Sequence, residues 1–436
     1  MDNSVNTREL VLEMLIEILE KEQYSHLVLR AVLDKYQYLT KQERAFITRL
    51  TEGTIESLIR LDYVLNQFSK TKVKKMKPLI RNVLRMSVYQ ILYMDRVPDS
   101  AVCNEAVKIV KKRGLGQLSG FVNGVLRSIA RGKDDIRYPQ KEEDYTRYLS
   151  VTYSVPEWII RQWLLQYSPE QTEAILRGFS GEKELFVRTN LRKITPERLV
   201  EKLAGEGVCA QIHPQLPYAL GLRGVDYLMG LPSFQEGDFY VQDISSMMVA
   251  QTAAPKQGDY VIDVCAAPGG KSTHLAELLD DSGYVDARDL TEYKVDLIRD
   301  NIERHKLDNI GAKVWDATVP DEASVGRANI LICDLPCSGL GVMGNKTDIR
   351  YKMTEEKQKS LVVLQRQILS TVWRYVKKGG SLIYSTCTIH QDENEGNVEW
   401  FLAEHPQFCC TSQQQIFPGT VGRDGFFIAR LIRDEE

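Results

Sequence analysis

The 436-residue sequence lacks the features that would place it in a membrane, in a disulfide-bonded scaffold or around a structural metal ion. No window approaches 18 uninterrupted apolar residues, and the first residues contain no basic segment followed by an apolar core. We therefore expect neither a membrane span nor a secretory signal. The eight cysteines have no framework spacing and form no C-x-x-C pair, which favours a reducing cytoplasm and argues against bound zinc. We expect a cytoplasmic protein with no metal and no membrane partner.

Acidic residues are absent from one stretch, residues 63–94. The whole chain has a net charge of only −3, but residues 1–133 contain 23 Lys and Arg against 14 Asp and Glu. The first part of the chain is therefore basic and the remainder acidic. A cluster of this kind attracts phosphate backbones, although a charge run is more commonly a solvated helix face. The cluster comprises Lys70, Lys72, Lys74, Lys75, Lys77, Arg81 and Arg85.

The spacing of hydrophobic residues divides the chain into three predicted domains. This number agrees with a typical domain length of about 150 residues. In residues 1–135 the apolar positions recur at helical spacing, which predicts an all-α bundle. A charged linker leads to residues 145–238, where two short helices precede a strand, a capped helix and a second strand, typical of a small α+β module. In residues 239–436 strands and helices alternate, which predicts an α/β, Rossmann-like parallel sheet with helices on both faces.

Two of the predicted parallel strands end near a cysteine. The apolar run 330–333 leads into Asp334 and Cys337, and the run 381–386, which follows a turn signal at 377–380, leads into Cys387. Because ligands bind at the carboxyl ends of strands in such sheets, we expect both cysteines at one edge. A thiol in a loop can have a lowered pKa and act as a nucleophile. Free cysteine is otherwise mostly a small buried hydrophobe, and this is our interpretation of Cys103, Cys209, Cys265 and Cys333.

The predicted first strand, 260–265, is followed by a loop of small residues. Its Gly-Gly-Lys-Ser sequence suggests a phosphate loop, but that motif requires glycine where Cys265 stands, and no G-x-G-x-x-G is present. Asp289 ends the next strand, where a carboxylate can bind both ribose hydroxyls, and Asp316 ends the third, within reach of an adenine amino group. Each acid alone would be interpreted as a solvated loop residue. Together with the loop they favour a nucleoside cofactor without a polyphosphate.

Three sequence motifs resemble those of one known enzyme family. Residues 263–273 (DVCAAPGGKST), 334–339 (DLPCSG) and 384–388 (YSTCT) are similar to motifs of the S-adenosylmethionine-dependent RNA 5-methylcytosine methyltransferases, as are residues 239–246 and 348–351. Residues 5–132 resemble the NusB family of RNA-binding helical domains. The combination resembles the ribosomal RNA small subunit methyltransferase B family, part of the RsmB/NOP group. Leu335, where the family usually has a smaller residue, and Tyr351, in place of a common tryptophan, remove no chemical group.

The resemblance implies a mechanism and a set of site residues. A Cys387 thiolate would add to C6 of a cytosine, so that C5 can take a methyl group from S-adenosyl-L-methionine. Asp334 would hydrogen-bond N3 or the amino group of the base, and Cys337 would assist release of the product, although swapped cysteine roles remain possible. Lys271 could equally face the substrate. The implied cofactor-binding residues are Cys265, Ala266, Ala267, Pro268, Gly269, Gly270, Lys271, Asp289, Asp316 and Asp334.

The implied substrate is 16S, or small-subunit, rRNA, bound by a monomer through its helical bundle and middle module. The target base would have to be unpaired or flipped out of its stack. Arg350 could contact this RNA or be structural. One alternative is the same chemistry on tRNA or large-subunit rRNA, against which the NusB-like half argues. Another is an inert RNA-binding regulator, against which the joint presence of both cysteines and all the acids argues.

Overall fold

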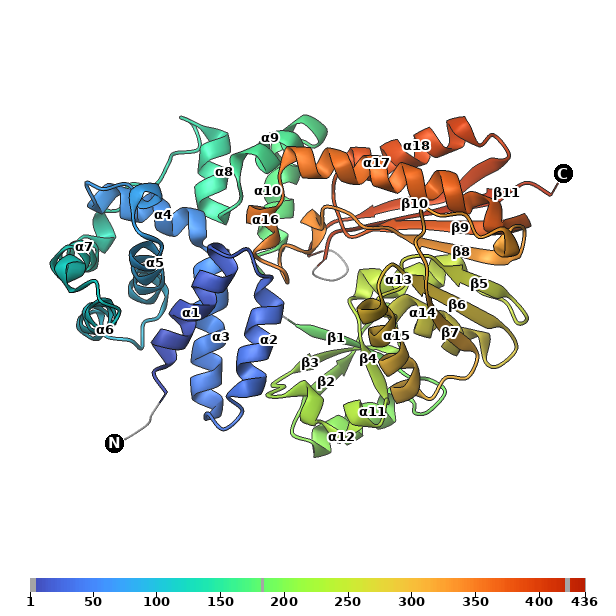
Figure 1. Cartoon of the computed structure of the whole chain (residues 1–436), viewed down its shortest axis with the longest axis horizontal. Helices are drawn as coiled ribbons and strands as arrows, with labels where there is room; N and C mark the ends of the chain where they lie inside the picture. Colours follow the sequence, from blue (N-terminus) through green and yellow to red (C-terminus); the bar gives the residue numbers. More distant parts are fainter. Residues whose placement is uncertain (1–4, 182–183, 420–423, 436) are drawn as a thin grey trace. The chain divides into compact units, whose positions relative to one another are not determined.

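The computed structural model describes residues 5–181, 184–419 and 424–435, which form two compact units (Figure 1). The first unit extends to Leu176 and also contains the later segment Lys346–Lys352. The second unit contains Arg177–Asn345 and the chain from Met353 onward. No described helix has both the length and the apolar character needed to cross a membrane.

The first unit is helical, as predicted. Helix α5 is its centre, because nearly all of its residues from Asn82 to Ile91 are buried among the surrounding helices. Gly53 in α3 permits a close approach to α5, since a Cβ atom there would lie 2.1 Å from the Tyr89 ring. The helices that form this bundle are α1 (Thr7–Leu19), α2 (Ser25–Lys35), α3 (Lys41–Glu56), α4 (Leu58–Phe68), α5 (Pro78–Tyr93), α6 (Asp99–Lys112) and α7 (Ser119–Arg131).

The basic cluster of this unit has two parts. Arg81 and Arg85 point inward and form ion pairs with Glu20 and Asp62, so these two arginines are structural. The five lysines between Lys70 and Lys77 lie in the segment that joins α4 to α5, in and around the short turn Val73–Lys75, and all are exposed. Only the lysines therefore remain as a candidate phosphate-binding surface.

Helices α8 (Tyr145–Tyr153), α9 (Glu157–Gln166) and α10 (Pro169–Gly178) follow the bundle, and α8 packs against α4. The segment Lys346–Lys352, which includes α16 (Ile349–Lys352), joins the same unit. Its Tyr351 hydroxyl donates to the carbonyl of Ser154 at 2.9 Å, and Arg350, 2% exposed, donates to the carbonyls of Tyr153 and Ser154. The sequence left open whether Arg350 contacts RNA or is structural, and these contacts make it a structural residue.

The second unit begins with a four-stranded antiparallel sheet in the order β2-β3-β1-β4. The sequence predicted β1 (Leu185–Thr189), α11 (Pro196–Gly205) and β2 (Cys209–Ile212), which are confirmed, but it missed β3 (Ala219–Arg223) and β4 (Phe239–Val241). The expectation that Cys209 is buried is wrong, because it opens an edge strand and is exposed. A short helix, α12 (Pro232–Gln235), packs near α11.

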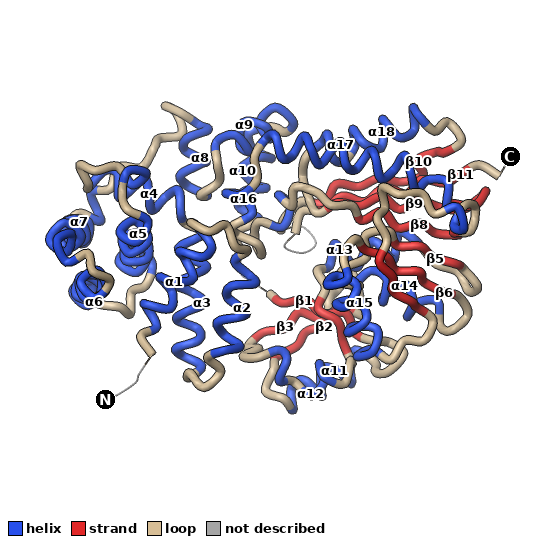
Figure 2. Tube along the Cα trace, viewed as in Figure 1, coloured by secondary structure: helices blue, strands red, loops and turns tan. Residues whose placement is uncertain are grey.

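A seven-stranded sheet follows, in the order β10-β11-β9-β8-β5-β6-β7 (Figure 2). The strands from β5 to β9 are parallel, which confirms the prediction of a Rossmann-like core, and β10 and β11 are antiparallel additions at one edge. The strands are β5 (Tyr260–Asp263), β6 (Tyr284–Asp289), β7 (Ile310–Val314), β8 (Ala328–Asp334), β9 (Val376–Thr386), β10 (Phe408–Ile416) and β11 (Phe426–Arg433).

Helices cover both faces of this sheet (Figure 1). On one face α17 and α18 bury Leu369, Val372 and Phe401 against the strands. On the other face α13 and α14 contribute Val249 and Leu275 to a second core, together with residues of α15. The helices are α13 (Ile244–Ala253), α14 (Gly270–Leu279), α15 (Glu292–His305), α17 (Glu355–Val372) and α18 (Glu395–Glu404).

Candidate active site

Strands β8 and β9 bring the two loop cysteines together. They are parallel neighbours in which Asp334 lies opposite Ser385, so their following loops leave the same edge of the sheet. The Sγ atoms of Cys337 and Cys387 are 3.1 Å apart, and the backbone N–H of Cys387 donates to Cys337 Sγ at 3.2 Å. Both side chains are partly exposed. The expectation that the cysteines meet at one edge is confirmed, and their chemical roles stay a prediction.

A buried carboxylate, Glu393, ties the two cysteine loops to each other. Its Oε2 accepts from the backbone N–H of Ser338 at 2.8 Å and its Oε1 from the Ser338 hydroxyl at 2.6 Å. The same hydroxyl lies 2.8 Å from Thr388 Oγ1 in the other loop. Our sequence analysis missed Glu393, because its strongly polar surroundings at 390–395 resemble an exposed loop.

Asp334 is the acid at the end of β8, and both of its carboxylate oxygens are hydrogen-bonded. Oδ2 accepts from Lys271 Nζ at 2.7 Å, and Oδ1 accepts from the Ser385 hydroxyl at 2.8 Å. Burial lowers the pKa of the Lys271 ammonium, but the charge of Asp334 and its hydrogen bond outweigh burial, so this pKa is raised from its ordinary value. The interaction with Asp334 directs the Lys271 side chain toward the cysteine loops.

The loop between β5 and α14 contains two glycines that the packing around them requires. Gly269 has a φ of +105°, a conformation that favours glycine, and a Cβ atom at Gly270 would lie 2.9 Å from the Tyr240 ring. Under the loop Asp263 is fully buried and accepts from the Ser272 hydroxyl at 2.5 Å, and burial raises the pKa of Asp263 to about 7. Cys265 is partly buried, and burial likewise raises the pKa of its thiol.

The next two strands place carboxylates beside this loop. Asp289 ends β6, is 3% exposed, and accepts from the backbone N–H of Ala267 at 2.9 Å, which fixes the loop. Asp316 lies two residues beyond the end of β7, is exposed, and accepts from the N–H of Thr318 at 2.8 Å. Given the strand order β8-β5-β6-β7, a row of polar groups runs along the edge from Asp334 to Asp316. Such a row, beside a loop of small residues, fits an elongated nucleoside cofactor.

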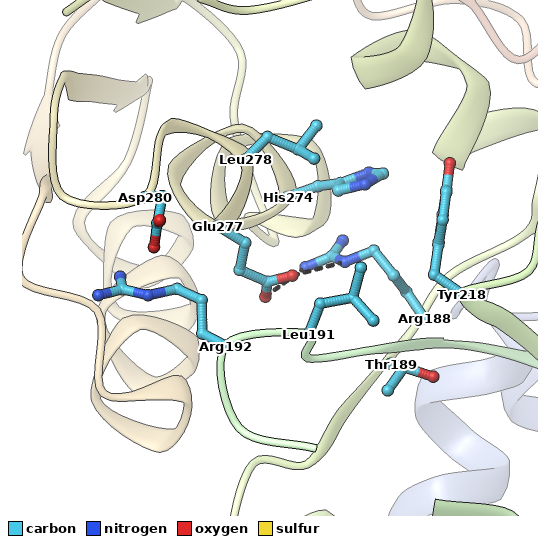
Figure 3. Close-up of a pocket in the computed structure, with 9 residues that line it drawn as sticks. All are labelled: Arg188, Thr189, Leu191, Arg192, Tyr218, His274, Glu277, Leu278 and Asp280. Carbon is cyan, nitrogen blue, oxygen red and sulfur yellow. Dashed lines mark hydrogen bonds and ion pairs between the residues drawn. The ribbon is translucent and has the colours of Figure 1, made fainter. Parts of the chain in front are cut away.

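A cavity of about 300 Å³ is lined by residues of β1, of the segment that follows it and of α14 (Figure 3). Beside it the buried Arg188 donates to both carboxylate oxygens of Glu277, at 2.9 and 3.2 Å, and to the carbonyl of Gly270 at 2.7 Å. Burial alone would raise the pKa of Glu277, but Arg188 and His305 bring it down to about 2. The Arg188–Glu277 pair therefore fixes the helix whose first residue belongs to the cofactor loop.

Comparisons with known protein families match each part of the chain. Residues 250–432 match the family described as 16S rRNA methyltransferase RsmB/F, and residues 5–131 match the NusB family. Residues 155–225 match the ferredoxin-like domain described as Methyltr_RsmF/B-like. The expected likeness of the helical bundle to NusB is thereby confirmed.

Full-length relatives and solved structures agree with these matches. The chain is 36% identical to the probable ribosomal RNA small subunit methyltransferase B of Bacillus subtilis, over 98% of each chain. It is 32% identical to the protein of the same name from Synechocystis, over 98% of this chain and 99% of the relative. The crystal structure of PH0851 superposes with a TM-score of 0.83 at 25% identity, over 98% and 99% of the two chains. NSun6 from Pyrococcus horikoshii with SFG shares the fold at a TM-score of 0.60 and 22% identity, over 64% of this chain and 98% of that one.

Proposed function

This chain belongs to the ribosomal RNA small subunit methyltransferase B family, and from this membership we propose that it transfers a methyl group from S-adenosyl-L-methionine to C5 of one cytosine in 16S rRNA. The observation that carries the chemical part of the proposal is the cysteine pair. Two sulfurs 3.1 Å apart lie in the loops after neighbouring parallel strands, and one of these strands ends at Asp334, the partner of Lys271. This arrangement suits nucleophilic addition to a ring carbon.

The chemistry requires a nucleophile on the protein, because C5 of cytosine is too weak a nucleophile to take the methyl group by itself. A thiolate that adds to C6 turns the ring into an enamine whose C5 can attack an electrophilic methyl group. S-adenosyl-L-methionine, when bound, supplies that methyl group on its sulfonium. A base, which can be solvent water, then takes the C5 proton, the C5–H electron pair restores the double bond between C5 and C6, and the sulfur leaves C6 as the thiolate with the methylated base released.

The surroundings of the two cysteines support Cys387 as the nucleophile. The ammonium of Lys271 interacts electrostatically with Cys387, which favours the charged form of that thiol. The pKa of Cys337 is raised well above its ordinary value by its hydrogen bond to Cys387, by burial and by the charge of Glu393. In this proposal Cys337 has the second role that the family resemblance implies, assistance in product release.

The other polar groups have separate tasks in this proposal. Asp334 binds the cytosine at N3 or at its amino group and so stabilises the adduct, while Lys271 and Ser385 hold the carboxylate in place. The loop from Cys265 to Lys271 lines the cofactor pocket, with Asp289 on the ribose and Asp316 near the adenine. The base has to leave its stack before the thiolate can reach C6.

The test is transfer of a labelled methyl group from S-adenosyl-L-methionine to unmodified 16S rRNA. We expect label at C5 of one cytosine, no label with Cys387→Ala, and a covalent complex between protein and RNA that accumulates with Cys337→Ala. Cys209→Ala, at an exposed cysteine on the small sheet, is the matched control and should retain native activity.

Each other outcome would correct a different part of the proposal. If Cys337→Ala is silent and Cys387→Ala traps RNA, the roles of the cysteines are reversed. Label in tRNA or in large-subunit rRNA instead would refute the substrate. Binding of RNA without any transfer would identify an inert regulator.

A further inference from the structure

Asn394 occupies the N-cap position of α18, but its side chain does not cap that helix. Asparagine is among the preferred N-cap residues, because its side-chain oxygen usually accepts from a backbone N–H of the first turn. Asn394 has no exposed surface, so the hydrogen-bonding capacity of its amide has to be met inside the protein. The partners that meet it all lie outside α18.

The two ends of the Asn394 amide bond to the residues on either side of Cys387. Its Oδ1 accepts from the Thr386 hydroxyl at 2.5 Å, and its Nδ2 donates to the backbone carbonyl of Thr388 at 3.2 Å. Thr386 is the last residue of β9, Thr388 directly follows Cys387, and neither threonine has exposed surface. One side chain therefore holds the chain immediately before and immediately after this cysteine.

Gln415, on β10, keeps the Asn394 amide in this orientation. Its Nε2 donates to the backbone carbonyls of Ile416 and Phe426, both at 3.0 Å, and its Oε1 accepts from Asn394 Nδ2 at 2.8 Å. Because Gln415 uses its Nε2 for two carbonyls, it presents its oxygen to Asn394. Asn394 then has to present Nδ2 to Gln415, which leaves its Oδ1 for the Thr386 hydroxyl.

The backbone of Cys387 is held by the other cysteine loop. Its N–H donates to Cys337 Sγ at 3.2 Å, and its carbonyl accepts from the N–H of Gly341 at 3.0 Å. Asn394 adds the bonds to the residue before and the residue after. The place of Cys387 Sγ, 3.1 Å from Cys337 Sγ, therefore depends on hydrogen bonds from two sides.

We propose that Asn394 is a positioning residue, which fixes the backbone around Cys387 so that its sulfur is held in place for addition to C6 of the cytosine. The inference rests on the proposed function, in which Cys387 is the nucleophile. Asn394 and the three groups that its side chain bonds are neutral, so it acts on the position of the sulfur. Placement of this kind governs rate, since a displacement of about 1 Å can cost about a hundredfold.

Steady-state methylation of unmodified 16S rRNA tests this role in Asn394→Ala. We expect kcat to fall on the order of a hundredfold. The KM for rRNA and the affinity for S-adenosyl-L-methionine should keep their native values, because Asn394 is fully buried and contacts neither. A variant with native kcat and a raised KM would overturn the proposal.

Thr386 offers an isosteric pair of variants that tests one hydrogen bond. Thr386→Val removes the hydroxyl that donates to Asn394 and keeps the shape of the side chain, so kcat should fall about tenfold. Thr386→Ser keeps the hydroxyl and should retain native kcat. If the serine variant loses as much as the valine variant, packing of the methyl group and not the hydrogen bond is responsible, and the proposal fails. This pair also decides the matter where Asn394→Ala does not fold.

Hydrogen exchange of the backbone amides tests the proposal without RNA or methyl transfer. In Asn394→Ala, deuterium uptake by residues 385–389 should be about tenfold faster than in the native protein, because the loop loses its anchor. Asn309→Ala is the matched control. Asn309 is also buried and its Nδ2 donates to the carbonyl of Ala276 at 2.9 Å, but it precedes β7, which three strands separate from β9 in the sheet.

The control variant should exchange at the native rate in residues 385–389 and keep native kcat. Equal changes in Asn394→Ala and Asn309→Ala would attribute both effects to general loss of stability and overturn the proposal. A folded Asn394→Ala protein with native exchange and native kcat overturns it as well. If exchange rises in Asn394→Ala alone but the native protein methylates no RNA, the positioning of the loop stands and the proposed function fails, so the two failures are distinguishable.

Discussion

The burial of Asp263 should make the stability of the protein depend on pH. Its pKa is raised to about 7 by burial, against an ordinary 3.8, and its nearest partner is the Ser272 hydroxyl. The folded protein therefore binds a proton between these two pH values that the unfolded chain has released. The associated stability is fully present below pH 3.8 and is lost as the pH rises through about 7.

We expect the free energy of unfolding of the native protein to fall by roughly 2–3 kcal/mol more than that of Asp263→Asn between pH 5 and pH 8, since each pKa unit corresponds to about 1.4 kcal/mol. Urea unfolding at the two pH values measures this difference. Asp300→Asn, at an exposed position of α15, is the control and should follow the native protein. Parallel behaviour of native protein and Asp263→Asn would show that Asp263 does not titrate in this range.

The residues of the site differ in how far the sequence could predict them. Cys337, Cys387 and Asp334 follow apolar runs, so their position at the end of strands was predictable from local pattern. Glu393 was not, since its burial results from packing of α17 and of the Ser338 loop against it, and its neighbours in the sequence are polar. The pairing of Lys271 with Asp334 depends on the order of β5 and β8 in the sheet, which the sequence alone did not give.

The secondary-structure elements likewise differ in how far the sequence could predict them. The parallel strands are buried apolar runs and were predicted, whereas β10 is an edge strand with a mostly exposed polar sequence and was missed. Strand β9 begins at Val376, before the predicted turn at 377–380. Val376 already pairs with Ala328 of β8, and after a register shift the pairing with β8 resumes at Ser381. Pairing with a neighbouring strand therefore determines both the existence of β10 and the start of β9.

Helix α14 is held to the small sheet by the buried pair of Arg188 and Glu277 (Figure 3). Arg188→Met would leave the Glu277 carboxylate buried without its main partner, and we expect a loss of about 3–5 kcal/mol in the free energy of unfolding. Because Arg188 also bonds the carbonyl of Gly270, affinity for S-adenosyl-L-methionine should fall in the same variant. Urea unfolding and calorimetric titration measure the two effects.

The double variant Arg188→Met with Glu277→Leu should recover much of the lost stability, since it leaves no unpaired charge. Arg299→Met is the control, because Arg299 pairs with Glu292 and Asp296 on an exposed surface and should cost less than about 1 kcal/mol. Equal losses from Arg188→Met and Arg299→Met would contradict a central role for the buried pair.

At the scale of the whole molecule, charge is concentrated where a large RNA could be bound. The five exposed lysines from Lys70 to Lys77 lie in a stretch without acids, while Arg81 and Arg85 are neutralised by ion pairs. Each lysine that contacts a phosphate should make the dependence of log affinity on log salt steeper by about 0.7 to 0.9. Contacts of this kind carry no base information, so their loss should weaken binding without changing which cytosine is modified.

We therefore expect replacement of these five lysines by glutamine to lower affinity for 16S rRNA on the order of tenfold to a hundredfold and to reduce the salt slope. Filter binding over a series of KCl concentrations measures both, and the methylated position should stay the same. The control variant replaces five exposed lysines of the second unit, Lys256, Lys306, Lys357, Lys359 and Lys378, which removes the same charge elsewhere. If both variants lose affinity equally, net charge and not this surface governs RNA binding. If only the first does, the helical unit supplies the phosphate contacts that hold the substrate while the cysteine pair acts on one base.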